Sequence, residues 1–153
     1  MKPNFNLKTI AFLLFIFLGT TTIAQTTHIV TLKVNTDLIT QRLTNRHATF
    51  GQPRGISNKN FTIYAYRGDI IEWEAVDSSG KNRPVTIEEI NYVSGTDLFD
   101  QKKIKKKGNE KKIKKKIKKG KRDQSEKYTI VFSFVKDGET KTIEIDPKIV
   151  IKK

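Results

Sequence analysis

The residues of this chain that could do chemistry are two histidines, a few paired carboxylates and one dense run of lysines. His28 and His47 are of the type that supplies a general base or a zinc ligand. No nucleophile elbow or similar local signature accompanies either of them, and no pair of ligand types lies at zinc spacing. We therefore interpret both histidines as solvated surface residues. We predict no catalytic residue, no metal ligand and no cofactor, with a hydrolase of unrecognised site as the alternative.

Four glutamates form close pairs along the chain, Glu72 with Glu74 and Glu88 with Glu89. Paired carboxylates can divide general acid and general base work between them. Here the first pair alternates with Ile71 and Trp73, which predicts the wet face of a half-buried strand. The second pair marks the edge of a predicted β-bulge. Neither pair therefore indicates catalysis.

A lysine run between residues 102 and 122 dominates the charge. It contains thirteen lysines, one arginine and one acid, Glu110, so it carries +13 of the formal net charge of +14. The first 24 residues contribute +2, which leaves the rest of the chain at −1. The charge is therefore concentrated in one cationic segment, and the rest of the chain after residue 24 is nearly neutral. The candidate polyanion-binding residues are the cations of this run: Lys102, Lys103, Lys105, Lys106, Lys107, Lys111, Lys112, Lys114, Lys115, Lys116, Lys118, Lys119, Lys121 and Arg122.

Two interpretations of the lysine run stay open. Clustered cations bind polyanions with salt-dependent affinity, because binding releases counterions. Lysine in place of arginine, and the lack of any aromatic residue, disfavour base readout and stacking, so this binding would be sequence-blind. Anionic lipid, acidic polysaccharide and extracellular DNA are the partners expected. The alternative is a solvated, low-complexity insertion between strands, forming a loop or a hairpin extension bent around Gly108 and Asn109.

The N-terminus predicts export. Lys2 and Lys8 precede an apolar run from Ile10 to Leu18, and small residues follow up to Ala24. These are the three parts of a cleavable signal peptide over residues 1–24, with cleavage before Gln25. Nine apolar residues rise only about 14 Å in a helix and do not span a bilayer. We therefore expect a periplasmic or secreted protein with no transmembrane segment.

The rest of the chain predicts strands. Alternating apolar residues begin at Val30, Phe61, Ile71 and Tyr128, and Asp137-Gly138 is a hairpin turn signal. Short strands with turns every 8–12 residues are typical of a β-sandwich. We predict an all-β, antiparallel β-sandwich of about seven strands over residues 25–153, with the lysine-rich segment as an insertion. The predicted core is Val30, Leu32, Ile63, Ile71, Trp73, Ile87, Ile90, Tyr128, Ile130, Phe132, Phe134, Ile143 and Ile145.

Several short motifs carry a resemblance to a known family. They are the opening strand at 29–37, the stretch 65–73 with its Gly68-Asp69 and Trp73, the stretch 92–99 with its Ser94-Gly95 and Phe99, and the stretch 145–149 with its Asp146-Pro147. In this order they resemble the AidA/PixA inclusion-body protein family. The resemblance implies an exported or stored, non-enzymatic β-sandwich without catalytic residues to carry over. The lysine run departs from the family pattern.

The stretch from Gly68 to Trp73 also resembles a strand of the cupredoxins. A blue-copper centre needs two histidines, one cysteine and a weak axial ligand. This chain has no cysteine, and its one methionine is Met1. The resemblance therefore implies a shared sandwich without the copper site, and we predict no electron transfer. The absence of cysteine also excludes disulfides and thiol nucleophiles.

Overall fold

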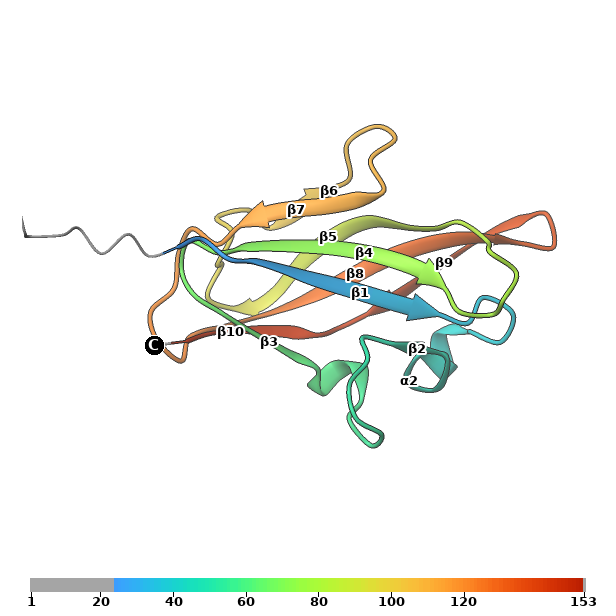
Figure 1. Cartoon of the computed structure of the whole chain (residues 1–153), viewed down its shortest axis with the longest axis horizontal. Helices are drawn as coiled ribbons and strands as arrows, with labels where there is room; N and C mark the ends of the chain where they lie inside the picture. Colours follow the sequence, from blue (N-terminus) through green and yellow to red (C-terminus); the bar gives the residue numbers. More distant parts are fainter. Residues whose placement is uncertain (1–23, 153) are drawn as a thin grey trace, which may run out of the picture.

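The computed structural model describes residues 24–152, which form two packed β-sheets (Figure 1). The strands are β1 (Thr27–Val34), β2 (Ala48–Thr49), β3 (Thr62–Ala65), β4 (Ile70–Asp77), β5 (Val85–Gly95), β6 (Lys103–Lys105), β7 (Lys112–Lys116), β8 (Ser125–Lys136), β9 (Glu139–Ile145) and β10 (Lys148–Ile151). Within this range the helical turns are η1 (Gln41–Leu43), α2 (Thr44–His47) and η2 (Asn58–Asn60). Apart from Ala24, the predicted signal peptide lies outside the described residues.

The first sheet has the strand order β2-β1-β4-β7, and the second has the order β3-β10-β8-β5-β6, with β9 also paired to β8. The all-β sandwich predicted from the sequence is confirmed. The antiparallel prediction needs correction, because β1 pairs with β4 and β3 pairs with β10 in parallel. The described residues also form ten strands rather than about seven, since several short edge pairings leave no clear alternation in the sequence.

The core lies between the sheets and is centred on aromatic side chains. Trp73 of β4 is fully buried, and its indole N–H donates to the Tyr128 hydroxyl of β8 at 3.2 Å. Phe99 meets the Trp73 ring edge-on, with centroids 5.4 Å apart. All thirteen predicted core residues are buried. The core also includes Leu98, Phe99 and three isoleucines of the lysine-rich segment.

Local backbone features agree with the sequence signals. The ladder between β5 and β8 shifts register between Ile87 and Glu89, where the slip in periodicity predicts a bulge. Asp137 and Gly138 both have positive φ, 53° and 77°, as a two-residue type I′ hairpin loop requires. Gly95 ends β5 with a φ of 92°, and a Cβ at this position would lie 2.2 Å from the Ser125 carbonyl oxygen. The close approach of β5 to β8 therefore demands glycine there.

Candidate polyanion-binding cleft

The lysine-rich segment forms the open edge of the sandwich. Its strand β6 extends the second sheet by pairing with β5, and β7 extends the first sheet by pairing with β4. The two strands do not pair with each other in the described ladders, so the hairpin extension that the sequence allows does not form. Figure 1 shows β6 and β7 joined by a projecting loop, with each strand on its own sheet.

Three isoleucines of this segment pack into the hydrophobic core. Ile104 of β6, Ile113 of β7 and Ile117 just after it are 5, 3 and 1% exposed. Because successive side chains of a strand point to opposite faces, burying these positions turns the neighbouring lysines toward solvent. The interpretation of 102–122 as a solvated insertion is therefore wrong for its strands. They cover part of the hydrophobic core.

Acids of the neighbouring strands neutralise many of the segment's cations. On the first sheet, Lys112 Nζ lies 2.7 Å from carboxylate oxygens of both Glu72 and Glu74, and Lys114 Nζ lies 2.7 Å from Glu72. Hydrogen bonds from Lys112 and Lys114 lower the pKa of Glu72 against the opposing effect of burial. Glu72 is itself only 4% exposed, and the side chains of Lys112 and Lys114 from the neighbouring strand lie against its carboxylate. The prediction that Glu72 lies on the solvent-exposed face of its strand is therefore wrong.

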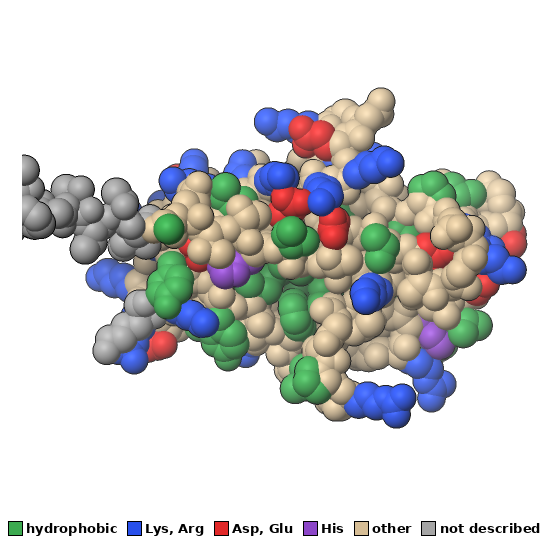
Figure 2. Space-filling view, in the orientation of Figure 1, with side chains coloured by type: hydrophobic (Ala, Val, Ile, Leu, Met, Phe, Trp, Pro, Cys, Tyr) green, Lys and Arg blue, Asp and Glu red, His purple; other side chains and the backbone are tan. Residues whose placement is uncertain are grey.

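Similar pairs form on the second sheet and at the ends of the segment. Lys103 pairs with Glu89 at 3.1 Å and Lys106 with Glu88 at 3.4 Å, both across the β5–β6 edge. The remaining pairs are Lys102 with Asp97, Lys119 with Asp100 and Arg122 with Asp123. In the space-filling view, acidic side chains accordingly lie among the lysines of the upper edge (Figure 2).

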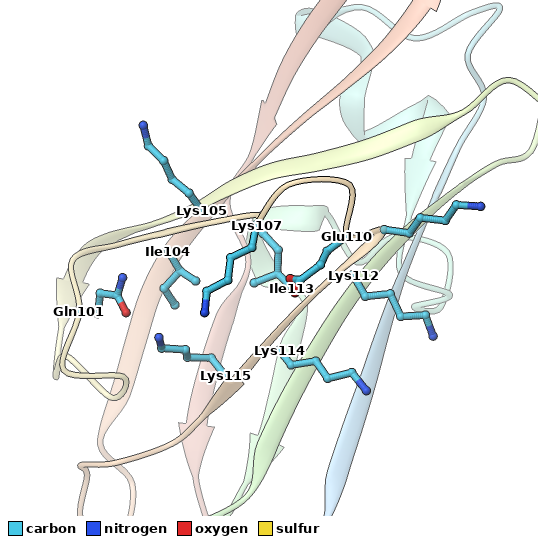
Figure 3. Close-up of a pocket in the computed structure, with 10 residues that line it drawn as sticks. Gln101, Ile104, Lys105, Lys107, Glu110, Lys112, Ile113, Lys114 and Lys115 are labelled. Atoms are coloured by element: carbon cyan, nitrogen blue, oxygen red, sulfur yellow. The ribbon is translucent and has the colours of Figure 1, made fainter.

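The ion pairs of residues 24–152 leave seven lysines of the run without a carboxylate partner: Lys105, Lys107, Lys111, Lys115, Lys116, Lys118 and Lys121. The first four of these line a cleft of about 560 Å³ between β6 and β7, which we call the basic cleft. The rest of its lining is formed by Gln101, Ile104, Glu110, Lys112, Ile113 and Lys114. Lys107 and Lys115 extend into the cleft, whereas Lys112 and Lys114 point away toward β4 (Figure 3).

A second cleft of about 580 Å³ lies on the other side of the loop and shares Glu110 and Lys111 with the basic cleft. Its other carboxylate, Asp77, is engaged in hydrogen bonds within the fold. Burial opposes ionisation of Asp77, but hydrogen bonds from Ser79, the Arg83 backbone N–H and Thr36 outweigh it and hold its pKa well below the usual range. Asp77 therefore acts as a structural acceptor for the loop after β4.

His28 is partly buried, which corrects its interpretation as a solvated residue. Its Nε2 lies 2.7 Å from Oδ2 of Asp69, a carboxylate only 2% exposed. Burial would raise the pKa of Asp69, but hydrogen bonds from the Tyr66 N–H, His28 and the Thr26 N–H lower it overall. Neither residue lines either cleft, and no hydrogen bond among residues 24–152 joins a histidine to a serine. This pair ties the start of β1 to the turn before β4.

Two further features of the described residues bear on function. Residues 24–152 contain no group of three or more His, Cys, Asp or Glu side chains placed to hold a metal ion. Within the same range, no helix has the length and apolar character needed to cross a membrane.

No family model and no curated protein matches this chain. Among solved structures, it is similar to the crystal structure of an inclusion body protein, PixA, from Burkholderia cenocepacia J2315. The two share 7% sequence identity at a TM-score of 0.44, over 86% of this chain and 99% of that chain. That protein bears the name of the family that the motifs resemble.

Proposed function

We propose that this protein is an exported, non-enzymatic binding protein that holds polyanions in the basic cleft. The division of the cations carries the proposal. Acids on β4, β5 and the flanking loops neutralise one set of lysines, and another set remains without carboxylate partners around a concave surface. Cations of one sign that line a cleft focus the electrostatic field and raise the local concentration of anions.

The chemistry of the cleft favours binding over catalysis. Its lining is four unpaired lysines, two paired ones, an amide, a carboxylate and two isoleucines, with neither histidine among them. Nothing in this set resembles a nucleophile activated by an adjacent base. A surface of this composition attracts and holds anions, which is the role that we assign to it.

Export determines which anions the cleft meets. Removal of residues 1–24 before Gln25 would deliver the sandwich to the periplasm or the medium, where anionic lipid, acidic polysaccharide and extracellular DNA are the polyanions within reach. Intact-mass measurement on cell fractions and medium tests this step. A mature species beginning at Gln25 outside the cytoplasm supports export, and an uncleaved cytoplasmic chain would contradict it.

Replacing the unpaired lysines by glutamine tests the cleft. The cleft variant is K105Q/K107Q/K111Q/K115Q, and the matched control, K33Q/K59Q/K81Q/K148Q, removes the same charge elsewhere. Point replacement is preferable to deletion of the segment, because Ile104, Ile113 and Ile117 belong to the core. With heparin as the probe, we expect the cleft variant to lose at least about tenfold in affinity and the control to lose about threefold or less. Equal losses in the two variants would contradict a localised site.

A further inference from the structure

The basic cleft contains acceptors as well as cations. Glu110 lines it, and no ion pair among the described residues engages its carboxylate. The Gln101 amide donates through Nε2 to the Lys103 carbonyl at 2.7 Å, and its Oε1 accepts no hydrogen bond from residues 24–152. Figure 3 shows Gln101 and Glu110 with the ammonium groups of Lys107 and Lys115 around the same cleft. The site therefore presents positive charge together with unused acceptor oxygens.

This combination selects among polyanions by their hydrogen-bonding groups. An ionised carboxylate can only accept hydrogen bonds. The phosphodiester group of a nucleic acid or of a lipid offers it no donor, and the negative charge of that group would repel Glu110. A chain that carries both acidic groups and hydroxyls satisfies both kinds of residue, because its hydroxyls donate to Glu110 and Gln101 while its acids meet the lysines.

We propose, building on the polyanion-binding function above, that the ligand of the basic cleft is an acidic polysaccharide. Its carboxylate or sulfate groups lie on the unpaired lysines, and its hydroxyls donate to Glu110 and Gln101. The cleft volume of about 560 Å³ suits a few units of a single sugar chain, since it falls within the range of roughly 300–1,000 Å³ typical of small-ligand sites.

The shape and lining of the cleft disfavour the other polyanions. No aromatic residue of the described range 24–152 lines it, so the bases of a single-stranded nucleic acid would lack a stacking surface. The apolar residues of the floor, Ile104 and Ile113, are 5 and 3% exposed and offer little surface for insertion into lipid. A flat bilayer or a duplex would reach the rim of the concave site and leave Lys107 and Lys115, which extend into it, poorly engaged.

The test compares three probes at equal charge concentration and fixed salt: polygalacturonate, a single-stranded thymidine oligonucleotide and vesicles containing dicetyl phosphate, an anionic phosphodiester without hydroxyl groups. The informative variant is Glu110→Ala, and Glu144→Ala, an exposed acid of β9 outside the cleft, is the matched control. We expect the unaltered protein to bind polygalacturonate most tightly. Glu110→Ala should weaken that binding by about tenfold through loss of hydrogen bonds to a charged acceptor, while slightly strengthening oligonucleotide binding. Glu144→Ala should leave the order unchanged.

The two proposals fail separately. A preference for the oligonucleotide or the vesicles, or tighter polygalacturonate binding by Glu110→Ala, would overturn the polysaccharide inference and leave polyanion binding standing. Absence of binding to all three probes, or binding that persists in the cleft variant, would overturn both.

Discussion

Among single residues, Glu126 holds the backbone of Leu98, and Leu98 in turn binds the end of the lysine-rich segment. The Leu98 N–H donates to its Oε2 at 2.7 Å, and the Leu98 carbonyl accepts from the backbone N–H groups of Lys118 and Lys119 at 2.8 and 3.0 Å. Glu126 is 1% exposed. Burial raises the pKa of this carboxyl to about 7, with Asp97 adding to the effect and the Leu98 N–H and Lys102 opposing it.

The raised pKa of Glu126 predicts a pH dependence of stability. Between the ordinary glutamate pKa of 4.5 and about 7, the folded chain holds a proton that the unfolded chain has lost. The free energy of unfolding should therefore fall as the pH rises through this window, by about 1–2 kcal/mol after allowance for solvent screening. Urea unfolding at pH 5 and pH 8 measures it. Glu126→Gln should remove most of the difference, and an unchanged difference in that variant would contradict the assignment.

Gly95 offers a test of the close approach between β5 and β8. Gly95→Ala combines a positive φ with a clash against the Ser125 carbonyl oxygen, whereas Gly80, at φ 81°, has open space where a Cβ would lie. We expect Gly95→Ala to cost about 2 kcal/mol or more in the free energy of unfolding, and Gly80→Ala about 1 kcal/mol. Chemical denaturation of both variants measures the difference. Equal costs would mean that the backbone of β8 moves aside easily.

At the scale of secondary-structure elements, β7 and the residue that follows it combine exposed lysines with buried isoleucines. Ile117, which directly follows β7, is 1% exposed, and its neighbour Lys116 is exposed. Ile117→Ala should lower the free energy of unfolding by about 2–4 kcal/mol. Lys116→Ala should change it by about 0.5 kcal/mol or less. Thermal or urea unfolding distinguishes them, and a neutral Ile117→Ala would show that the segment is not part of the core.

The sequence predicts the elements whose alternation is long and regular. In β8, residues Tyr128, Ile130, Phe132 and Phe134 repeat with a period of two, and each is buried. In the lysine run three isoleucines stand among fourteen cations, which is too weak a pattern to settle between strand and disorder. The segment forms strands because β6 pairs with β5 and β7 pairs with β4, and the β4–β7 pairs join residues that are distant in the sequence. Local pattern does not contain that information.

At the scale of the whole molecule, lysines of the cationic segment lie on one edge strand of each sheet. Strands β6 and β7 are edge strands of different sheets, and both carry lysines on their solvent faces. Lysine on an edge strand opposes pairing with another chain. The same residues thus protect two exposed edges, and the gap between those edges forms the basic cleft.

The sequence predicts which segment contains the candidate site, but it does not predict which residues of that segment line the cleft. Composition alone identifies 102–122 as the cationic region. It treats Lys112 and Lys115 as equals, although the first pairs with Glu72 and the second extends into the cleft. Glu110 and Gln101, which give the cleft its acceptors, carry no signal in the sequence. Their importance arises when β6 and β7 join different sheets.

The salt dependence of polyanion binding tests the central claim most directly. With a thymidine oligonucleotide as a probe of known charge density, the logarithm of the binding constant falls linearly with the logarithm of salt concentration, by about 0.7 per phosphate neutralised. We predict that the cleft variant, which lacks four lysines, shows a slope shallower by about 3, while the matched control changes it by about 1 or less. The same slope for the unaltered protein and the cleft variant would contradict binding in the basic cleft.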